Sequence, residues 1–192
     1  MTINIKNMVC LRCVMLVKKI LDEMEVPYYK VNLGEADLKY PLTMSQKEQL
    51  ACTLANWGLE LIDGNKDILV DKIKRSVIKM VHEDSMLSTL KISHYLSTNL
   101  NYNYTYIANI FSQETGICLR DFIIAHKVEK IKELLMMEGM SVTEIAWKLN
   151  YSSVSHLSNQ FTKVTGLSPS KFKKGSNVRL IPLENVGMLE AV

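Results

Sequence analysis

The feature that most constrains the fold of this chain is a motif that occurs twice, 50 residues apart. The two copies are Asn109-x-Phe111-x-x-x-Thr115-Gly116-Ile117-x-x-x-x-Phe122 and Asn159-x-Phe161-x-x-x-Thr165-Gly166-Leu167-x-x-x-x-Phe172. A repeat of this length indicates one small helical module that is built twice. In each copy a short helix, a turn, a second helix and a glycine stop follow one another, so we predict two helix-turn-helix units in tandem.

The rest of the C-terminal part has the apolar spacing of helices. Residues 65–84 predict a long connector helix that ends at Glu83-Asp84-Ser85. Further helices are predicted over Leu90–Thr98, Thr105–Thr115, Leu119–Glu138, Ser141–Leu149 and Ser153–Thr165, and a short one from Ser168. We therefore expect an all-α domain over residues 85–174, and a flexible tail over the aperiodic residues 175–192.

The first 64 residues have the pattern β-α-β-β-α-β. Strands are predicted near Ile3, over Tyr28–Leu33 and Glu35–Tyr40, and near Leu59, with helices over Leu11–Glu25 and Gln46–Trp57. Ser45 and Glu48 have the spacing of a capping box for the second helix. A four-stranded antiparallel sheet with two helices on one face is the ferredoxin-like arrangement. The predicted fold class is an α+β ferredoxin-like domain followed by an all-α domain, mostly helical overall.

The second helix of each predicted helix-turn-helix unit carries short hydrogen-bonding side chains on its outer face. Such side chains reach the base edges of DNA in the major groove. The candidate base contacts are Thr105, Tyr106 and Asn109 in the first unit and Ser155, His156 and Asn159 in the second. Asn109 and Asn159 are equivalent in the repeat, and asparagine can pair with adenine N6 and N7.

Positive charge is concentrated in the second unit, although the net charge of the chain is only +3. Residues 141–179 contain six Lys and Arg side chains and one acid, Glu144. A local basic patch on a nearly neutral protein favours phosphate contact, and an ordinary solvated surface is the alternative. The candidate phosphate contacts are Lys148, Ser153, Lys163, Lys171, Lys173 and Lys174.

One run in this part resembles the C-terminal signature of AraC/XylS transcription regulators. The run is Ile145-Ala146-x-x-Leu149-Asn150-Tyr151-x-x-x-Ser155-x-Leu157-Ser158-x-x-Phe161-x-Lys163-x-x-Gly166-x-Ser168-Pro169-x-x-Phe172. The similarity spans about residues 88–174. It implies two helix-turn-helix units joined by a long helix, with recognition helices in successive major grooves of double-stranded DNA. RNA polymerase and a second copy of the chain are further candidate partners of such a bacterial-type regulator.

This chain departs from the family at several positions. Asn150-Tyr151 stands where Gly-Phe is usual, Leu157 where an aromatic residue is usual, and Lys127 where arginine is usual. The family's base-contacting positions include Ala108 and Val154, which cannot hydrogen-bond, and neither recognition helix contains arginine. Base readout is therefore expected to be weak, or to use methyl contacts and DNA shape.

A second motif, Cys10-x-x-Cys13, falls between the first strand and the first helix. The spacing lets both thiols converge on one ion or on each other, and a helix start lowers thiol pKa. The run Met8-x-Cys10-x-x-Cys13 resembles the loop of heavy-metal-associated domains, which implies Cys10 and Cys13 as ligands for Cu(I) or Zn(II) with Met8 behind them. A redox dithiol and two half-buried structural cysteines are the alternatives. Cys52 and Cys118 are expected to be core or boundary residues.

Other classes of function find no support in the sequence. No nucleophile elbow, HExxH, P-loop or dinucleotide motif occurs, so an enzyme is not expected. No apolar stretch approaches a membrane span and no signal peptide is evident, which favours the cytoplasm and no membrane partner. We therefore expect a DNA-binding transcription regulator, with a metal- or redox-responsive N-terminal domain. The alternatives are a metal chaperone or thiol-redox protein with a partner-binding helical half, and a regulator whose N-terminal domain only dimerises.

Overall fold

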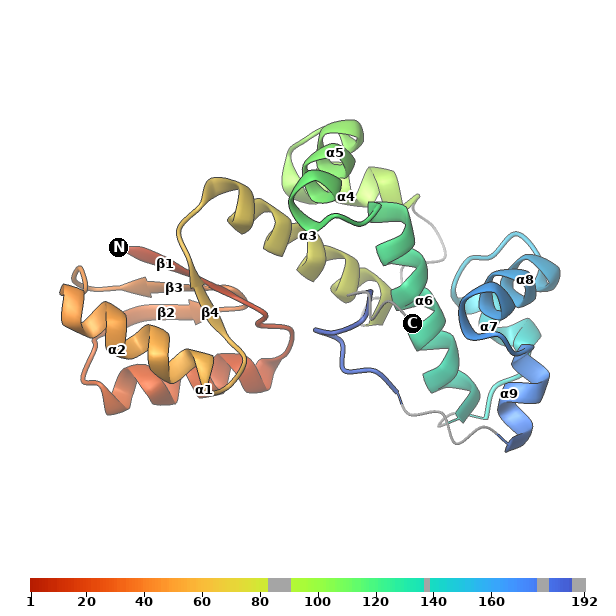
Figure 1. Cartoon of the computed structure of the whole chain (residues 1–192), viewed down its shortest axis with the longest axis horizontal. Helices are drawn as coiled ribbons and strands as arrows, with labels where there is room; N and C mark the ends of the chain where they lie inside the picture. The colour runs from red at the N-terminus through yellow and green to blue at the C-terminus, as the bar shows by residue number, and fades with distance from the viewer. Residues whose placement is uncertain (83–90, 137–138, 176–179, 188–192) are drawn as a thin grey trace. The chain divides into compact units, whose positions relative to one another are not determined.

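The computed structural model describes residues 1–82, 91–136, 139–175 and 180–187 (Figure 1). The chain divides into two compact units, Met1–Arg75 and Ser76–Val192. The division falls inside helix α3 (Asn65–His82), not at residue 64. The first unit extends this far because α3 contacts its loops: the Asn7 backbone N–H donates to Asp71 Oδ1 at 3.3 Å, and the Arg75 guanidinium donates to the Leu33 carbonyl.

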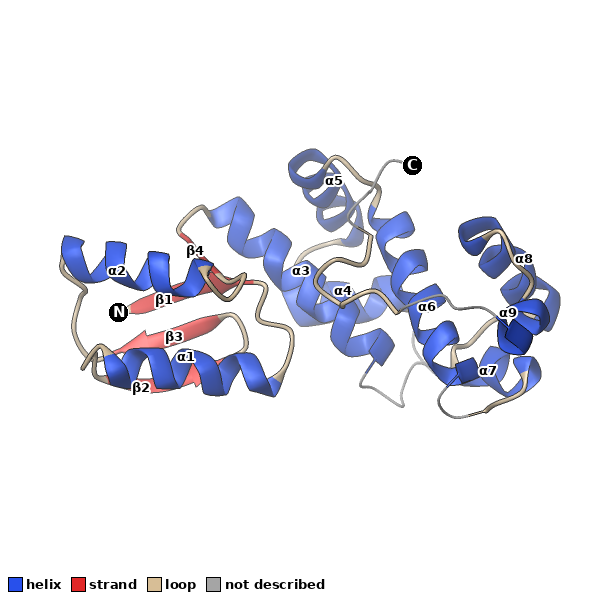
Figure 2. Cartoon of the chain, turned by 60° about the horizontal axis from the view of Figure 1, so that its bottom comes forward, coloured by secondary structure: helices blue, strands red, loops and turns tan. Residues whose placement is uncertain are grey.

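The first unit has the expected order of strands and helices. The elements are β1 (Thr2–Lys6), α1 (Leu11–Glu23), β2 (Tyr28–Asn32), β3 (Glu35–Leu38), α2 (Met44–Ala55) and β4 (Glu60–Ile62). The sheet order is β2-β3-β1-β4, and every neighbouring pair is antiparallel. Helices α1 and α2 pack side by side along the sheet (Figure 2). The outer strand β2 pairs with β3 through a register shift between Tyr28 and Lys30.

The apolar residues that form the hydrophobic core of this unit have the spacing that each strand and helix requires. Ile3 and Ile5 alternate inward on β1, and Val17 and Leu21 recur at helical spacing on α1. Helix α2 begins at a capping box formed by Thr43 and Gln46, so the predicted box of Ser45 and Glu48 is wrong. Both pairs have the required spacing, and spacing alone could not separate them.

The second unit is helical over its described residues. After the end of α3 come α4 (Ile92–Leu100), α5 (Tyr104–Thr115), α6 (Leu119–Met136), α7 (Val142–Lys148), α8 (Val154–Thr165) and α9 (Pro169–Gly175). Helices α4 and α5 form one helix-turn-helix unit, α7 and α8 form the other, and the long α6 connects them (Figure 1). The predicted helix end at Glu83-Asp84-Ser85 lies outside the described residues.

The repeated motif residues have the same structural task in both copies. Gly116 and Gly166 end α5 and α8 with φ of 73° and 74°, where only glycine is free of strain. The hydroxyls of Thr115 and Thr165 donate to the carbonyls of Phe111 and Phe161, one turn earlier. The same phenylalanines are fully buried, each against the motif's final phenylalanine, with ring centroids 5.1 and 5.3 Å apart.

The described part of the C-terminal tail, residues 180–187, packs against α6. The Ile181 backbone N–H donates to Glu129 Oε1 at 2.6 Å, and Val186 is buried. Gly187 approaches Phe122 so closely that a Cβ atom would lie 2.9 Å from its ring. Residues 176–179 and 188–192 lie outside the described residues. None of the helices in the described segments is long and apolar enough to cross a membrane.

Candidate nucleic-acid interface

Helix α8 separates its buried and exposed side chains as an amphipathic helix should. Leu157 and Phe161 are fully buried, whereas Ser155, His156 and Asn159 are exposed. Ser153 caps the helix by accepting a hydrogen bond from the His156 backbone N–H at 3.0 Å. The three candidate base contacts of the second unit therefore lie together on one solvent-facing surface of α8.

His156 is held in place from two directions. Its Nδ1 atom lies 3.0 Å from the Ser152 hydroxyl, and its ring meets the ring of Tyr151 edge to face at 5.3 Å. The contact at Nδ1 leaves Nε2 for an outside partner. A fixed imidazole loses little side-chain freedom on binding, which suits it to base recognition.

A network behind α8 was not anticipated from the sequence. The Tyr151 hydroxyl donates to Gln160 Oε1 at 2.6 Å. Lys127 of α6 donates to the Leu149 carbonyl at 3.2 Å, and its Nζ lies 4.9 Å from the centre of the Tyr151 ring. Burial lowers the pKa of Lys127 and raises that of Tyr151. Gln160 is therefore a half-buried partner of the turn.

The first unit presents a different surface. Thr105, Tyr106 and Asn109 are exposed on α5, while Ile107 and Ile110 are buried. Tyr106 stacks on the exposed Tyr102, with ring centroids 5.1 Å apart. Tyr106 occupies the position of His156 in the repeat, so an aromatic pair stands in the first unit where the second has a tyrosine and a histidine.

Both turns contain an asparagine in the left-handed conformation. Asn150 has φ of 52°, as its place in the predicted turn requires, and Asn101 has φ of 56° in the equivalent turn. A tyrosine follows each asparagine. The first turn is one residue shorter, so the two asparagines do not share the 50-residue spacing of the repeated motif.

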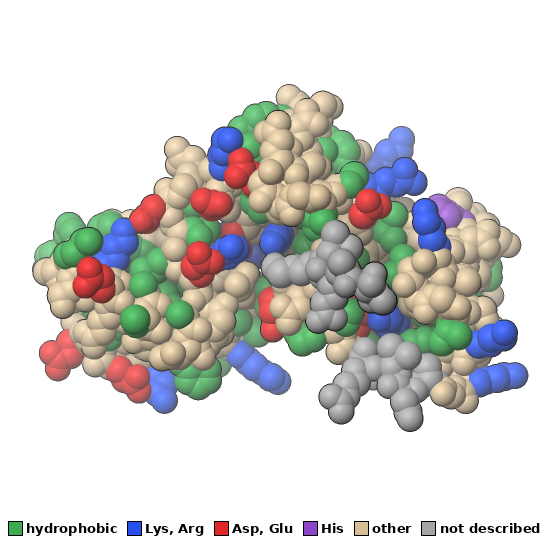
Figure 3. All heavy atoms as spheres, in the orientation of Figure 1, with side chains coloured by type: hydrophobic (Ala, Val, Ile, Leu, Met, Phe, Trp, Pro, Cys, Tyr) green, Lys and Arg blue, Asp and Glu red, His purple; other side chains and the backbone are tan. Residues whose placement is uncertain are grey.

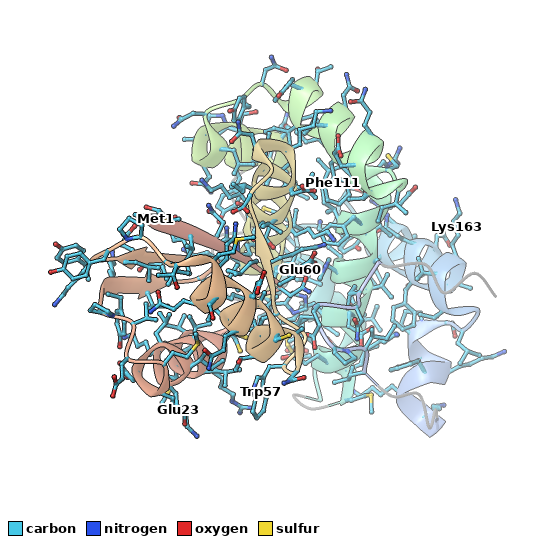
Figure 4. The ribbon with its side chains drawn as sticks, turned by 60° about the vertical axis from the view of Figure 1, so that its left-hand side comes forward. Met1, Glu23, Trp57, Glu60, Phe111 and Lys163 are labelled. Atoms are coloured by element: carbon cyan, nitrogen blue, oxygen red, sulfur yellow. The ribbon has the colours of Figure 1, made fainter. Side chains whose placement is uncertain are left out.

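The candidate phosphate contacts divide into two groups. Lys148, Lys163, Lys171 and Lys174 are exposed, and Lys163 projects from α8 while Phe111 lies inside the helical unit (Figure 4). Lys173 instead donates to the carbonyls of Gly139 and Met140 at 2.7 and 2.9 Å. Because its ammonium group closes the turn before α7, Lys173 has a structural role. The Ser153 hydroxyl is likewise engaged in its cap.

Cys10 and Cys13 lie at the start of α1, with their Sγ atoms 3.6 Å apart. Two sulfurs bound tetrahedrally to one zinc ion lie roughly 3.8 Å apart for Zn–S bonds of about 2.3 Å, so one ion can fit both thiols. Met8 is fully buried behind them, and its Sδ accepts from the Gly34 N–H at 3.3 Å. Among the described residues no group of three or more His, Cys, Asp or Glu side chains could hold a metal.

The pKa of one of the two thiols differs from the expectation. Burial raises the pKa of Cys13, although the start of a helix was expected to lower it. The hydrogen bond from the Cys13 N–H to the Cys10 carbonyl, at 3.0 Å, is part of the first turn. Cys52 and Cys118 are exposed, so their expected place in the core or at its boundary is wrong.

The C-terminal unit is similar to a helix-turn-helix family model and to regulatory proteins of bacteria. A family model described as a helix-turn-helix domain matches residues 96–175. The HTH-type transcriptional regulator YtdP of Bacillus subtilis is 25% identical over 113 residues, which are 59% of this chain and 14% of that protein. The Msm operon regulatory protein of Streptococcus mutans is 26% identical over 97 residues, 50% of this chain and 34% of that protein.

A longer match includes the first unit. The melibiose operon regulatory protein of Escherichia coli is 23% identical over 181 residues, 85% of this chain and 59% of that protein. Among solved structures, the C-terminal domain of AraT from Geobacillus stearothermophilus has a TM-score of 0.49 at 22% identity, covering 60% of this chain and 92% of that one. The chain spans less than two thirds of the length of each of these three curated relatives.

These similarities agree with the geometry of the two helical repeats. Residues 96–175 of this chain therefore contain a helix-turn-helix domain.

Proposed function

We propose that the protein is a sequence-specific transcription regulator whose α5 and α8 enter successive major grooves on one face of DNA. The observation that supports this most strongly is the equal construction of the two helix-turn-helix units. In both, a side-chain N-cap (Asn103 or Ser153) and a glycine stop bound a helix whose exposed face carries polar side chains. We take residues 85–174 as the DNA-binding domain, and double-stranded DNA as the partner.

Base readout is assigned to Thr105, Tyr106 and Asn109 on α5 and to Ser155, His156 and Asn159 on α8. All six are exposed on their helices. The exposed lysines Lys148, Lys163, Lys171 and Lys174 supply phosphate attraction, which carries no sequence information. Two reading helices in one chain allow a monomer to bind DNA. A second copy and RNA polymerase remain candidate partners for the regulatory step.

The first unit is proposed to be a ferredoxin-like sensor similar to heavy-metal-associated domains. The strand order, the antiparallel pairing and the buried Met8 behind the Cys10–Cys13 loop support this proposal. The two thiols would hold a soft ion such as Cu(I) or Zn(II), which would replace the thiol protons by metal–sulfur bonds. A reversible disulfide is the redox form of the same proposal.

The testing experiment is a genome-wide selection of DNA fragments bound by the reduced protein, with and without Cu(I) or Zn(II). A shared motif with two half-sites about one helical turn apart is expected. Metal-dependent occupancy that disappears in Cys10→Ser/Cys13→Ser would make the first unit a sensor. Absence of enrichment at any salt concentration, with tight metal binding, would instead favour a metal chaperone.

A further inference from the structure

A groove of about 760 Å³ lies within the second unit, between the beginning of α6 and the exposed face of α8. The α8 side contributes three of the proposed DNA contacts, His156, Asn159 and Lys163. The opposite side includes Gly116 at the end of α5, the first turns of α6 with Arg120, and Gly187 of the tail. The groove therefore lies beside both helices that are proposed to enter the major grooves.

Arg120 lines two hollows in this part of the second unit. Besides the large groove, it lines an adjacent hollow of about 230 Å³, which it shares with His156 and Gln160. Its side chain is exposed. Among the described residues, neither the Arg120 guanidinium nor the Lys163 ammonium group forms an ion pair with a carboxylate. Figure 3 shows Lys and Arg side chains (blue) near a histidine side chain (purple) in this part of the molecule. One acid, Asp121, lines the same groove.

A protein that places two helices in successive major grooves must meet the sugar-phosphate strands that run between those grooves. These strands have to pass over the surface that separates the two helices. In this chain that surface contains the groove, with a guanidinium on one side and an ammonium on the other. Arginine presents a planar set of donors that matches the oxygens of a phosphate.

We propose that this groove seats the DNA backbone between the two half-sites, with Arg120 and Lys163 as its phosphate-binding side chains. The inference rests on the proposed function and adds Arg120, which no resemblance or motif suggested. Asp121 faces the same backbone and opposes its binding. Opposite effects are therefore expected from the two side chains. The positive charge of Arg120 should strengthen binding to every duplex, and the negative charge of Asp121 should weaken it.

The experiment measures the binding of random-sequence duplex DNA to the full chain by fluorescence anisotropy over a range of salt concentrations. Arg120→Ala should lower the affinity roughly tenfold on all sequences and reduce the salt slope by about 0.9, the value for one phosphate contact. Arg120→Lys should keep the slope, because it keeps the charge. Asp121→Asn should tighten binding to every duplex.

Lys18→Ala is the matched control, since it removes one exposed positive charge from α1 in the other unit. Circular dichroism establishes that each variant is folded. Wild-type affinity and slope in Arg120→Ala would overturn the inference, and so would a loss confined to one base position, which would make Arg120 a base contact. If the wild-type chain itself shows no salt-dependent duplex binding, the proposed function has failed instead.

Discussion

The contact between Tyr151 and Gln160 allows a quantitative test of how the second recognition helix is held. In Tyr151→Phe only the hydroxyl is lost, so the 2.6 Å hydrogen bond to Gln160 disappears while the ring stays beside His156 and Lys127. A hydrogen bond of this kind contributes about 1 kcal/mol net, and a half-buried carbonyl left without its donor adds a few tenths. We therefore expect a loss of about 1–1.5 kcal/mol.

Thermal unfolding followed by circular dichroism measures this loss as a fall in Tm of roughly 4 °C for a unit of this size. Tyr106→Phe is the control, because this substitution removes a tyrosine hydroxyl from a side chain that is 44% exposed. Tyr106 lies in the first helix-turn-helix unit. A double-mutant cycle with Gln160→Leu isolates the pair. If Tyr151→Phe unfolds like wild type, or if the cycle gives a coupling near zero, the proposed anchoring of α8 is refuted.

Three further perturbations separate structural from DNA-binding roles. Lys173→Ala should lower thermal stability, because two carbonyls of the turn lose their donor, and leave the salt slope of DNA binding unchanged; a slope reduced by about 0.9 would show phosphate contact instead. Asn159→Ala should cost roughly 1–3 kcal/mol on the selected site and relax one base position, whereas an equal loss on random DNA would contradict base readout. His82 has its pKa lowered from 6.5 to about 4 by burial and by Lys130, against the opposing effect of Glu133. Since folding disfavours the protonated ring, this contribution to stability is present above pH 6.5 and is lost as the pH falls toward 4. His82→Gln should flatten the pH dependence of unfolding in that window, and an unchanged profile would place the titration elsewhere.

The sequence predicted the helical half well because its signals are local. A Thr-Gly pair ends α5 and α8 through a hydroxyl and a positive φ, and both effects act within a few residues. The choice of Thr43 over Ser45 as a cap could not be predicted in this way, because both have acceptable partners three residues on. Sequence spacing alone cannot choose between two possible N-cap residues when the packing of the whole helix determines which one is used.

The contacts that escaped prediction join residues far apart in the chain. Lys127 donates a hydrogen bond to the Leu149 carbonyl, 22 residues away in the sequence. Lys173 donates to the Gly139 carbonyl, 34 residues away. A lysine in a basic stretch suggests phosphate binding, and only the fold reveals that its ammonium group is already occupied. The contact of Ile181 with Glu129 of α6 and the burial of Val186 are likewise not visible as a periodic spacing in the sequence.

The register shift in β2 has a consequence for how the first unit behaves at high concentration. Unpaired strand edges can recruit further chains into growing sheets, and irregular, charged edges discourage this. Here one edge strand carries both the shift and the exposed Lys30, and the other edge, β4, has only three residues. Neither edge offers a long flat template for fibre growth. The dense solutions needed for metal titrations should therefore stay free of β-type aggregates.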